Sequence, residues 1–150
     1  MAIDFTLAPE HEEVRTRVRT FIQDTVQPRV KGFDDENRVT QRREYLVTIL
    51  ELREEAKRVG LWLPHMPEEW GGMGLGHVAL AMVQAEAGKT RLGPWILNCM
   101  APDEGNMHTL LHWGSDEQKE NYLRRLCEGT AMSCFAIETS VRKSSPRSIL

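Results

Sequence analysis

The chain of 150 residues has only three cysteines, Cys99, Cys127 and Cys134. Their odd number and the absence of a C-x-x-C spacing argue against a disulfide framework and against a zinc site built on thiolates. Aromatic residues make up 7% of the chain, and no apolar run approaches the roughly 20 residues that cross a bilayer. The net charge of −3 offers nucleic acid and anionic lipid no attraction. These absences predict a soluble protein with reduced thiols and with no nucleic-acid or membrane partner.

The N-terminus also lacks the features of a targeting segment. The opening MAIDFTLAPEHEE becomes acidic within a few residues, whereas signal and transit peptides begin with basic residues. A cytoplasmic location is therefore expected. The length corresponds to one domain, which at this size buries roughly 68–70% of its unfolded surface.

Apolar residues at spacings of three and four predict helices along most of the chain. The first begins at Pro9, a residue suited to the first helical position, and ends at Pro28 and Gly32. Ser115 and Gln118 form a capping-box pattern at the start of the last helix. The expected helices are 9–28, 42–59, 77–87, 93–99, 106–113 and 116–128. The helix at 77–87 is nearly all small and apolar, which predicts a place in the middle of a bundle.

The segment Thr130–Ile137, TAMSCFAI, has the pattern of a buried strand. A lone strand leaves its backbone polar groups without partners. Either β structure follows it, or a partner chain supplies the neighbouring strand. The predicted fold is therefore all-α: a bundle of about six helices with one short C-terminal strand.

The connection Leu61–Gly76, LWLPHMPEEWGGMGLG, is the most informative segment of the chain. Four glycines in sixteen residues permit left-handed backbone and close packing. Its two prolines exclude a helix on either side of the dipeptide between them. The composition predicts an ordered, shaped connection, which we name the signature loop.

The signature loop resembles the GLxGLxxPxxYGGxGL element of the acyl-CoA dehydrogenase family. The matching residues are Gly60, Leu61, Pro67, Trp70, Gly71, Gly72, Gly74 and Leu75. The start IDFTLAPEHEEVRTRVRTF is similar to the first helix of that family, and Gly114–Lys119 is similar to its GTEEQK motif. The stretch Cys99–Met107 most resembles the subfamily that is fused to a kinase-like domain in animals. The resemblance extends from Phe5 to about Ser145.

This resemblance implies a domain organisation and a chemistry. Residues 1–129 would form the N-terminal α-helical domain of the family, and residues 130–150 the start of a middle β domain, truncated and off-pattern. Family members oxidise acyl-CoA thioesters at the α,β bond, using a glutamate base and FAD. The base belongs to a C-terminal domain that follows the middle domain. No catalytic residue is therefore assigned here, and this chain alone is expected to be inactive.

The resemblance also implies binding residues. The family pattern FAMTEPxxASSD aligns with the sequence from Phe135 onward, where Glu138 and Thr139 stand in inverted order. The residues expected to contact FAD are Phe135, Ile137, Glu138, Thr139 and Ser144. The residues expected to line the pocket of the acyl-CoA substrate are Asn98, Met100 and Ala101.

An alternative function from another class is a non-catalytic helical interaction or structural module. Such a module would pair with a partner subunit, as a homo- or hetero-oligomer, through the exposed strand. The discriminating feature is that strand, which left unpaired would promote aggregation.

Three other patterns have both a functional and a structural interpretation. His108 and His112 are spaced i,i+4 and with a third ligand could bind zinc, but they lack the glutamate of HExxH, which favours a structural role. Asp103 and Glu104 could be a catalytic pair, although turn and cap roles are more common. The four tryptophans could form a stacking wall, although core packing is more common.

Overall fold

The structure is a computed structural model that describes residues 8–33 and 40–135. Within those ranges the chain forms helices joined by turns, and no strand is present. None of the helices in the described part is long and apolar enough to cross a bilayer. The expectation of a helical bundle is confirmed.

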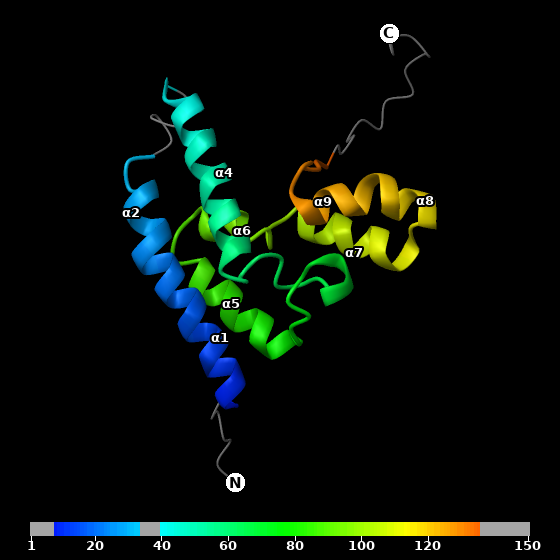
Figure 1. Cartoon of the computed structure of the whole chain (residues 1–150), viewed down its shortest axis with the longest axis horizontal. Coiled ribbons are helices and arrows are strands. Elements are labelled where there is room, and N and C mark those ends of the chain that lie inside the picture. Colours follow the sequence, from blue (N-terminus) through cyan, green and yellow to red (C-terminus); the bar gives the residue numbers. More distant parts are fainter. Residues whose placement is uncertain (1–7, 34–39, 136–150) are drawn as a thin grey trace, which may run out of the picture.

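The N-terminal arm is one continuous helical rod (Figure 1). It consists of α1 (Pro9–Thr20), a π-helical stretch η1 (Phe21–Val26) and α2 (Gln27–Val30). The helix begins at Pro9 and ends just before Gly32, as predicted, but it continues through Pro28. A proline ring clashes with the carbonyl four residues earlier in a regular α-helix, and the wider π turns just before Pro28 relieve that crowding. The buried stripe of the arm is Val18, Phe21, Ile22 and Val26.

Three helices pack around this arm: α4 (Arg42–Arg58), α5 (His77–Ala87) and α6 (Gly93–Ile96). Helix α5 lies directly against α1 (Figure 1). The expectation that α5 would occupy the middle of the bundle is wrong. It buries Ala79, Val83, Glu86 and Ala87, whereas Val78 is 55% exposed. Small residues allow close approach on one face and are tolerated by solvent on the other.

A second group of helices lies on the C-terminal side (Figure 1). It comprises α7 (Asp103–Trp113), α8 (Asp116–Gln118), η3 (Lys119–Leu123) and α9 (Arg124–Glu128). The capping box is present: the amide of Gln118 donates to Ser115 Oγ at 3.2 Å, and the amide of Ser115 donates to Gln118 Oε1 at 2.9 Å. Gly129, with φ of 73°, ends the last helix. Helix α7 begins at Asp103, three residues before the predicted start at Asn106.

The signature loop joins α4 to α5 and is packed, as predicted. Residues 61–66 are all buried, and a single 3-10 turn, η2 (Glu68–Trp70), follows them. Its backbone is paired internally and with α6, since the amide of Leu63 donates to the carbonyl of Leu97 at 2.9 Å. Gly72 has no left-handed φ. A Cβ there would lie 2.1 Å from the carbonyl oxygen of Met66, so close packing is what requires glycine.

The predicted strand at Thr130–Ile137 is wrong over its described part. Ala131–Phe135 has no strand conformation, and Ile137 lies outside the described residues. A strand is stabilised by ladder hydrogen bonds to a neighbour. The described part of the chain offers this segment no second strand.

Candidate functional site

The residues expected to line an acyl pocket lie in the turn between α6 and α7. Asn98 is buried, with 2% of its surface exposed, whereas Met100 is 42% exposed and Ala101 is also exposed. Together with Met132 and Ser133 they border a small hollow of about 140 Å³. We name residues 98–103 the site turn. The three predicted residues line one hollow, with Asn98 buried at its base and Met100 and Ala101 exposed.

The sequence explains why the turn begins at Asn98. Helix α6 starts at Gly93-Pro94, and Gly93 touches the preceding helix so closely that a Cβ would lie 2.1 Å from the carbonyl oxygen of Ala87. Asn98 ends the helix with a φ of 56°. Asparagine is among the few residues that adopt this left-handed conformation readily. The chain turns there, and after the buried Cys99 it presents Met100 and Ala101 to solvent.

A buried arginine supports the site turn from below. Arg53 of α4 is 4% exposed, and it donates to the carbonyl of Trp95 at 3.0 Å and to Asn98 Oδ1 at 3.3 Å. Its guanidinium lies 4.7 Å from the centre of the Trp62 ring. Burial lowers the pKa of Arg53, and the charge of Asp103 acts in the opposite direction. The group remains a cation, because arginine starts from so high a pKa.

The amide of Asn98 completes this framework, since its Nδ2 donates to the carbonyl of Leu126 at 3.1 Å. The site turn is thereby connected to α4 and to α9 through one side chain. A buried network with its groups paired fixes one arrangement of the elements it joins. The buried base of the site turn is therefore rigid, whereas its rim, formed by Met100 and Ala101, is exposed.

Asp103 joins the site turn to the segment after α9. One carboxylate oxygen accepts from the amide of Ser133 at 2.6 Å and from its hydroxyl at 2.5 Å. Glu104 points to a different partner and accepts from Gln84 Nε2 at 3.2 Å. The two neighbouring carboxylates do not form a pair. The geometry therefore does not support Asp103 and Glu104 as a catalytic pair.

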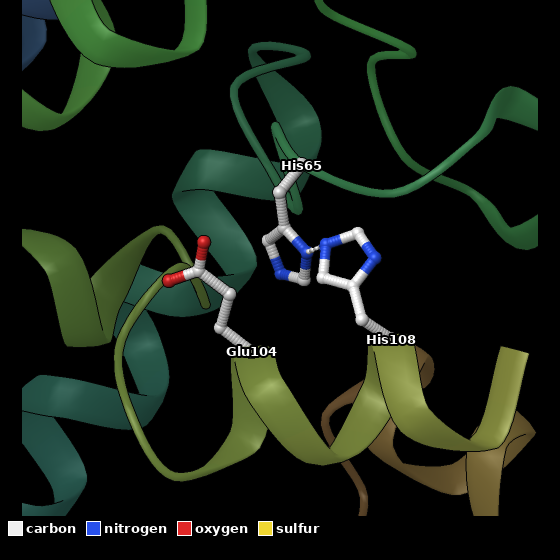
Figure 2. Close-up of side chains that lie close together, drawn as sticks. All are labelled: His65, Glu104 and His108. Carbon is white, nitrogen blue, oxygen red and sulfur yellow. Dashed lines mark hydrogen bonds between the residues drawn. The ribbon is translucent and has the colours of Figure 1, made fainter. Parts of the chain in front are cut away.

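His65 of the signature loop is a site residue that the sequence did not reveal. Its Nε2 lies 3.0 Å from the carbonyl oxygen of Asn98, and its Nδ1 lies 3.1 Å from Nε2 of His108 (Figure 2). Burial lowers the pKa of His65 to about 4, so the imidazole is neutral at neutral pH. His65 and His108 are 43 positions apart, and no spacing rule connects them. The Pro-His-Met-Pro context, which excludes helix on both sides, was the only sequence signal that His65 occupies a shaped position.

The exposed side chains of the site turn could hold a ligand by contact alone. The outward side chains of Met100 and Ala101 carry no group that titrates. Burial raises the pKa of Cys99 to about 12 and that of Cys127 to about 11, so neither thiol is a nucleophile at neutral pH. The rim is apolar and its base is polar and buried. Such a surface suits an apolar ligand that is oriented, not transformed, by these residues.

The residues expected to contact FAD lie mostly outside the described part of the chain. Phe135 is described and is 64% exposed; Ile137, Glu138, Thr139 and Ser144 are not described. A flavin cradle needs buried, convergent polar groups against the ring and pyrophosphate. Phe135 alone supplies none, so the described residues do not fit the cofactor by themselves.

The tryptophans divide between the two interpretations. Trp62 is buried, and its Nε1 donates to the carbonyl of Cys127 at 2.8 Å, as expected for core packing. Trp70 and Trp95 are partly buried against the core. Trp113 is 87% exposed, so the core assignment is wrong for that residue. It is the last residue of α7, where the helix has left the core.

Comparison with known proteins gives a consistent answer. Residues 8–130 match the family model of the acyl-CoA dehydrogenase N-terminal domain. The chain is 36% identical to human acyl-CoA dehydrogenase family member 11, over 97% of this chain and 19% of that protein. It is 31% identical to Mycobacterium tuberculosis "Probable acyl-CoA dehydrogenase FadE2", over 98% of this chain and 36% of that protein.

A solved structure of a proposed acyl-CoA dehydrogenase from Mycobacterium abscessus superposes with a TM-score of 0.70 at 29% identity. The match covers 83% of this chain and 33% of that one. The chain thus spans about a fifth of its human relative and a third of the solved structure. The chain belongs to the acyl-CoA dehydrogenase N-terminal domain family.

Proposed function

We propose that this chain is the N-terminal α-helical part of an FAD-dependent acyl-CoA dehydrogenase and that its site turn lines the acyl pocket. The observation that carries this proposal is the exposed apolar rim of Met100, Ala101 and Met132 on a rigid polar base. An alkyl chain has no polar group to recognise, so a pocket for it needs apolar side chains at fixed positions. Asn98 contributes from beneath as a positioning residue, because its own polar atoms are all directed inward.

Oxidation itself requires groups that the described residues do not supply. The base and the flavin of family members carry the proton and hydride transfers. We therefore propose that residues 1–129 act as one wall of a larger active site, and that residues 130–150 lead toward the β domain. The purified chain should be colourless and should not oxidise acyl-CoA with an artificial electron acceptor. A yellow chain whose flavin is bleached by acyl-CoA would contradict this inactivity.

The acyl-pocket assignment can be tested in a chimera. Residues 8–130 would replace the matching segment of the human relative, and flavin content and acyl-CoA oxidation would be measured. In that chimera, Met100→Arg should raise KM for acyl-CoA by about tenfold, since a charge replaces an apolar wall.

Two variants serve as controls for that experiment. Met100→Leu keeps the volume and polarity of the wall and should leave KM within about twofold. Leu50→Arg places the same charge at an exposed apolar position of α4, where Leu50 is 58% exposed. If Met100→Arg and Leu50→Arg raise KM for acyl-CoA equally, the site turn does not line the acyl pocket.

A second candidate function is a helical module that pairs with a partner subunit. One observation favours it: an apolar groove of about 410 Å³ lies between α7 and the η3–α9 segment. Its wall includes Leu110, Tyr122 and Leu126, and Tyr122 is 61% exposed. A partner or a following domain would cover such a surface.

Light scattering tests this second candidate. A chain that pairs with itself through the groove should show a concentration-dependent mass that Tyr122→Glu abolishes. Trp113→Glu, at another exposed aromatic, should leave the mass unchanged. A monomer at all concentrations would exclude self-association and leave the enzyme-domain proposal untouched.

A further inference from the structure

Three side chains with metal-binding atoms lie close together (Figure 2). His65 comes from the signature loop, and Glu104 and His108 come from successive turns of α7. One ligand atom from each lies within 4.8 Å of the others. We propose that His65, Glu104 and His108 bind a divalent transition-metal ion, with Zn²⁺ the best match, and leave a fourth position for water. This proposal stands apart from the acyl-pocket assignment.

The two imidazoles already have nearly the spacing that such an ion imposes. His65 Nδ1 and His108 Nε2 are 3.1 Å apart. Two nitrogens on a tetrahedral ion at about 2.0–2.1 Å stand about 3.3–3.4 Å from each other. An ion would draw the carboxylate inward from its wider separation. That movement is open to Glu104, whose side chain is only partly buried.

The surrounding hydrogen bonds orient the ligands as in established metal sites. A carbonyl oxygen only accepts, so the 3.0 Å contact with Asn98 makes His65 Nε2 the protonated nitrogen. The lone pair of His65 is then on Nδ1, which accepts from His108 Nε2 in the metal-free chain. When the ion binds, His108 would carry its proton on Nδ1 instead, so that both facing nitrogens have a lone pair for the metal. A histidine whose second nitrogen donates to a carbonyl is the common arrangement around metals. Glu104 is oriented by a hydrogen bond as well, since the side-chain Nε2 of Gln84 donates to its carboxylate at 3.2 Å.

The donor set and the location indicate what the ion would do. Two imidazoles, one carboxylate and an open position suit Zn²⁺ better than Mg²⁺ or Ca²⁺, which prefer oxygen ligands throughout. An ion here would fasten the signature loop to α7. The carbonyl of Asn98, which accepts from His65, would be fixed by the same contact.

The chain provides a matched control in His112. Its ring stacks nearly parallel to that of His108, with 6.1 Å between the ring centres, and the residue is exposed. It lies one turn further along α7 and is not one of the three proposed ligands. Loss of His112 should therefore leave the site intact. A second control is Cys134, an exposed thiol that could bind the metal by itself.

The experiment is a titration of the metal-free full chain with Zn²⁺. Calorimetry measures the binding, and the midpoint of thermal unfolding measures the stabilisation. We expect one ion per chain and a raised midpoint, because a ligand of the folded state stabilises it. His108→Ala and Glu104→Gln should each weaken binding by at least about tenfold, whereas His112→Ala and Cys134→Ser should leave it within about twofold. Circular dichroism would verify that each variant is folded.

Co²⁺ gives an independent spectroscopic measurement. The site should produce the visible absorption of a four-coordinate ion, with no thiolate charge-transfer band in the near ultraviolet. A thiolate band, or binding lost with His112→Ala and kept with Glu104→Gln, would overturn the proposed ligand set. A folded chain that shows no saturable Zn²⁺ binding would overturn the site altogether.

Discussion

The signature loop and the segment Ala131–Phe135 both lack extended regular structure, yet they differ in order. In the loop, residues 61–66 are buried, and the amides of Met73 and Gly74 donate to the carbonyls of Leu63 and Met66. In the segment after α9, Met132 is 62% exposed and Phe135 is 64% exposed. Irregular backbone is therefore fixed where its polar groups are paired and its side chains are buried, whatever its conformation.

The two segments also differ in how they are attached. The loop is joined to α6 through its backbone and to α7 through His65. The segment after α9 is joined mainly through Ser133, which donates twice to Asp103 and lies 2.8 Å from Asn106 Nδ2. Substitutions in the loop should therefore destabilise the whole domain, and substitutions in the segment should act locally. The following predictions run from the largest expected effect to the smallest.

Gly72→Val should destabilise the domain by at least about 3 kcal/mol, because the new Cβ meets backbone and the packed loop cannot move. The nearest atom is the carbonyl oxygen of Met66, at 2.1 Å. Urea unfolding measures the effect. Gly76→Ala, where a Cβ has nothing within 4 Å, should change the stability by less than about 1 kcal/mol. Similar values for both variants would show that the loop is not tightly packed.

Arg53→Met should lower the free energy of unfolding by about 2–4 kcal/mol, since it leaves buried acceptors of Trp95 and Asn98 without a donor. The same assay measures it. Arg58→Met removes an exposed pair with Glu55 on the same helix and should change stability by less than about 1 kcal/mol. If the two variants agree, the polar base of the site turn is not a supporting framework.

Glu86 of α5, which pairs with Arg19 of α1, gives a reference away from both irregular segments. Hydrogen bonds from Arg19 and Lys89 outweigh burial and lower the pKa of Glu86 to about 2. A depressed carboxyl pKa stabilises the folded state above the pKa of the unfolded chain, and that contribution is lost as the pH falls toward 2.

Glu86→Gln should therefore reduce stability near neutral pH by about 1–2 kcal/mol, a range kept low by the partial exposure of both cations. The difference from the parent chain should shrink between about pH 5 and pH 2. Unfolding curves at several pH values measure it. A difference that stays constant down to pH 3 would contradict the assignment.

Ser133→Ala should change global stability by no more than about 1 kcal/mol, because only one tether of an exposed segment is lost. The local effect should be larger: alkylation of the neighbouring Cys134 thiol should accelerate. Thr130→Ala removes a hydroxyl that donates to the carbonyl of Arg125 nearby and serves as the comparison. The proposed difference between the two segments would be contradicted if alkylation of Cys134 became slower. It would also be contradicted if Ser133→Ala lowered the free energy of unfolding as much as Gly72→Val.

Local patterns predicted much of the fold. Helix α5 has the predicted bounds His77–Ala87, because Gly76 and Gly88 mark its ends. The capping box at Ser115 and the left-handed Gly60, with φ of 68°, also follow from neighbouring residues alone. The family assignment from the signature loop is confirmed, since the family model of the acyl-CoA dehydrogenase N-terminal domain matches residues 8–130.

What the sequence did not reveal depends on contacts between distant segments. Arg53 looks like a surface residue of an amphipathic helix, and it is buried because Trp62 and Asn98 come to it from other elements. The partnership of His65 with His108 has the same origin. The strand prediction was wrong over residues 131–135, because apolar residues there indicate burial only when another strand or domain covers them.

Native-state hydrogen exchange measured by NMR on this chain tests the central claim most directly. The amides of Leu63, Met73 and Gly74 in the signature loop should exchange only through global unfolding, whereas those of Cys134 and Phe135 should exchange through local motion. Adding Zn²⁺ should slow exchange in the loop further and leave the C-terminal segment unchanged. Loop amides that exchange as fast as those of Cys134 and Phe135 would contradict the account.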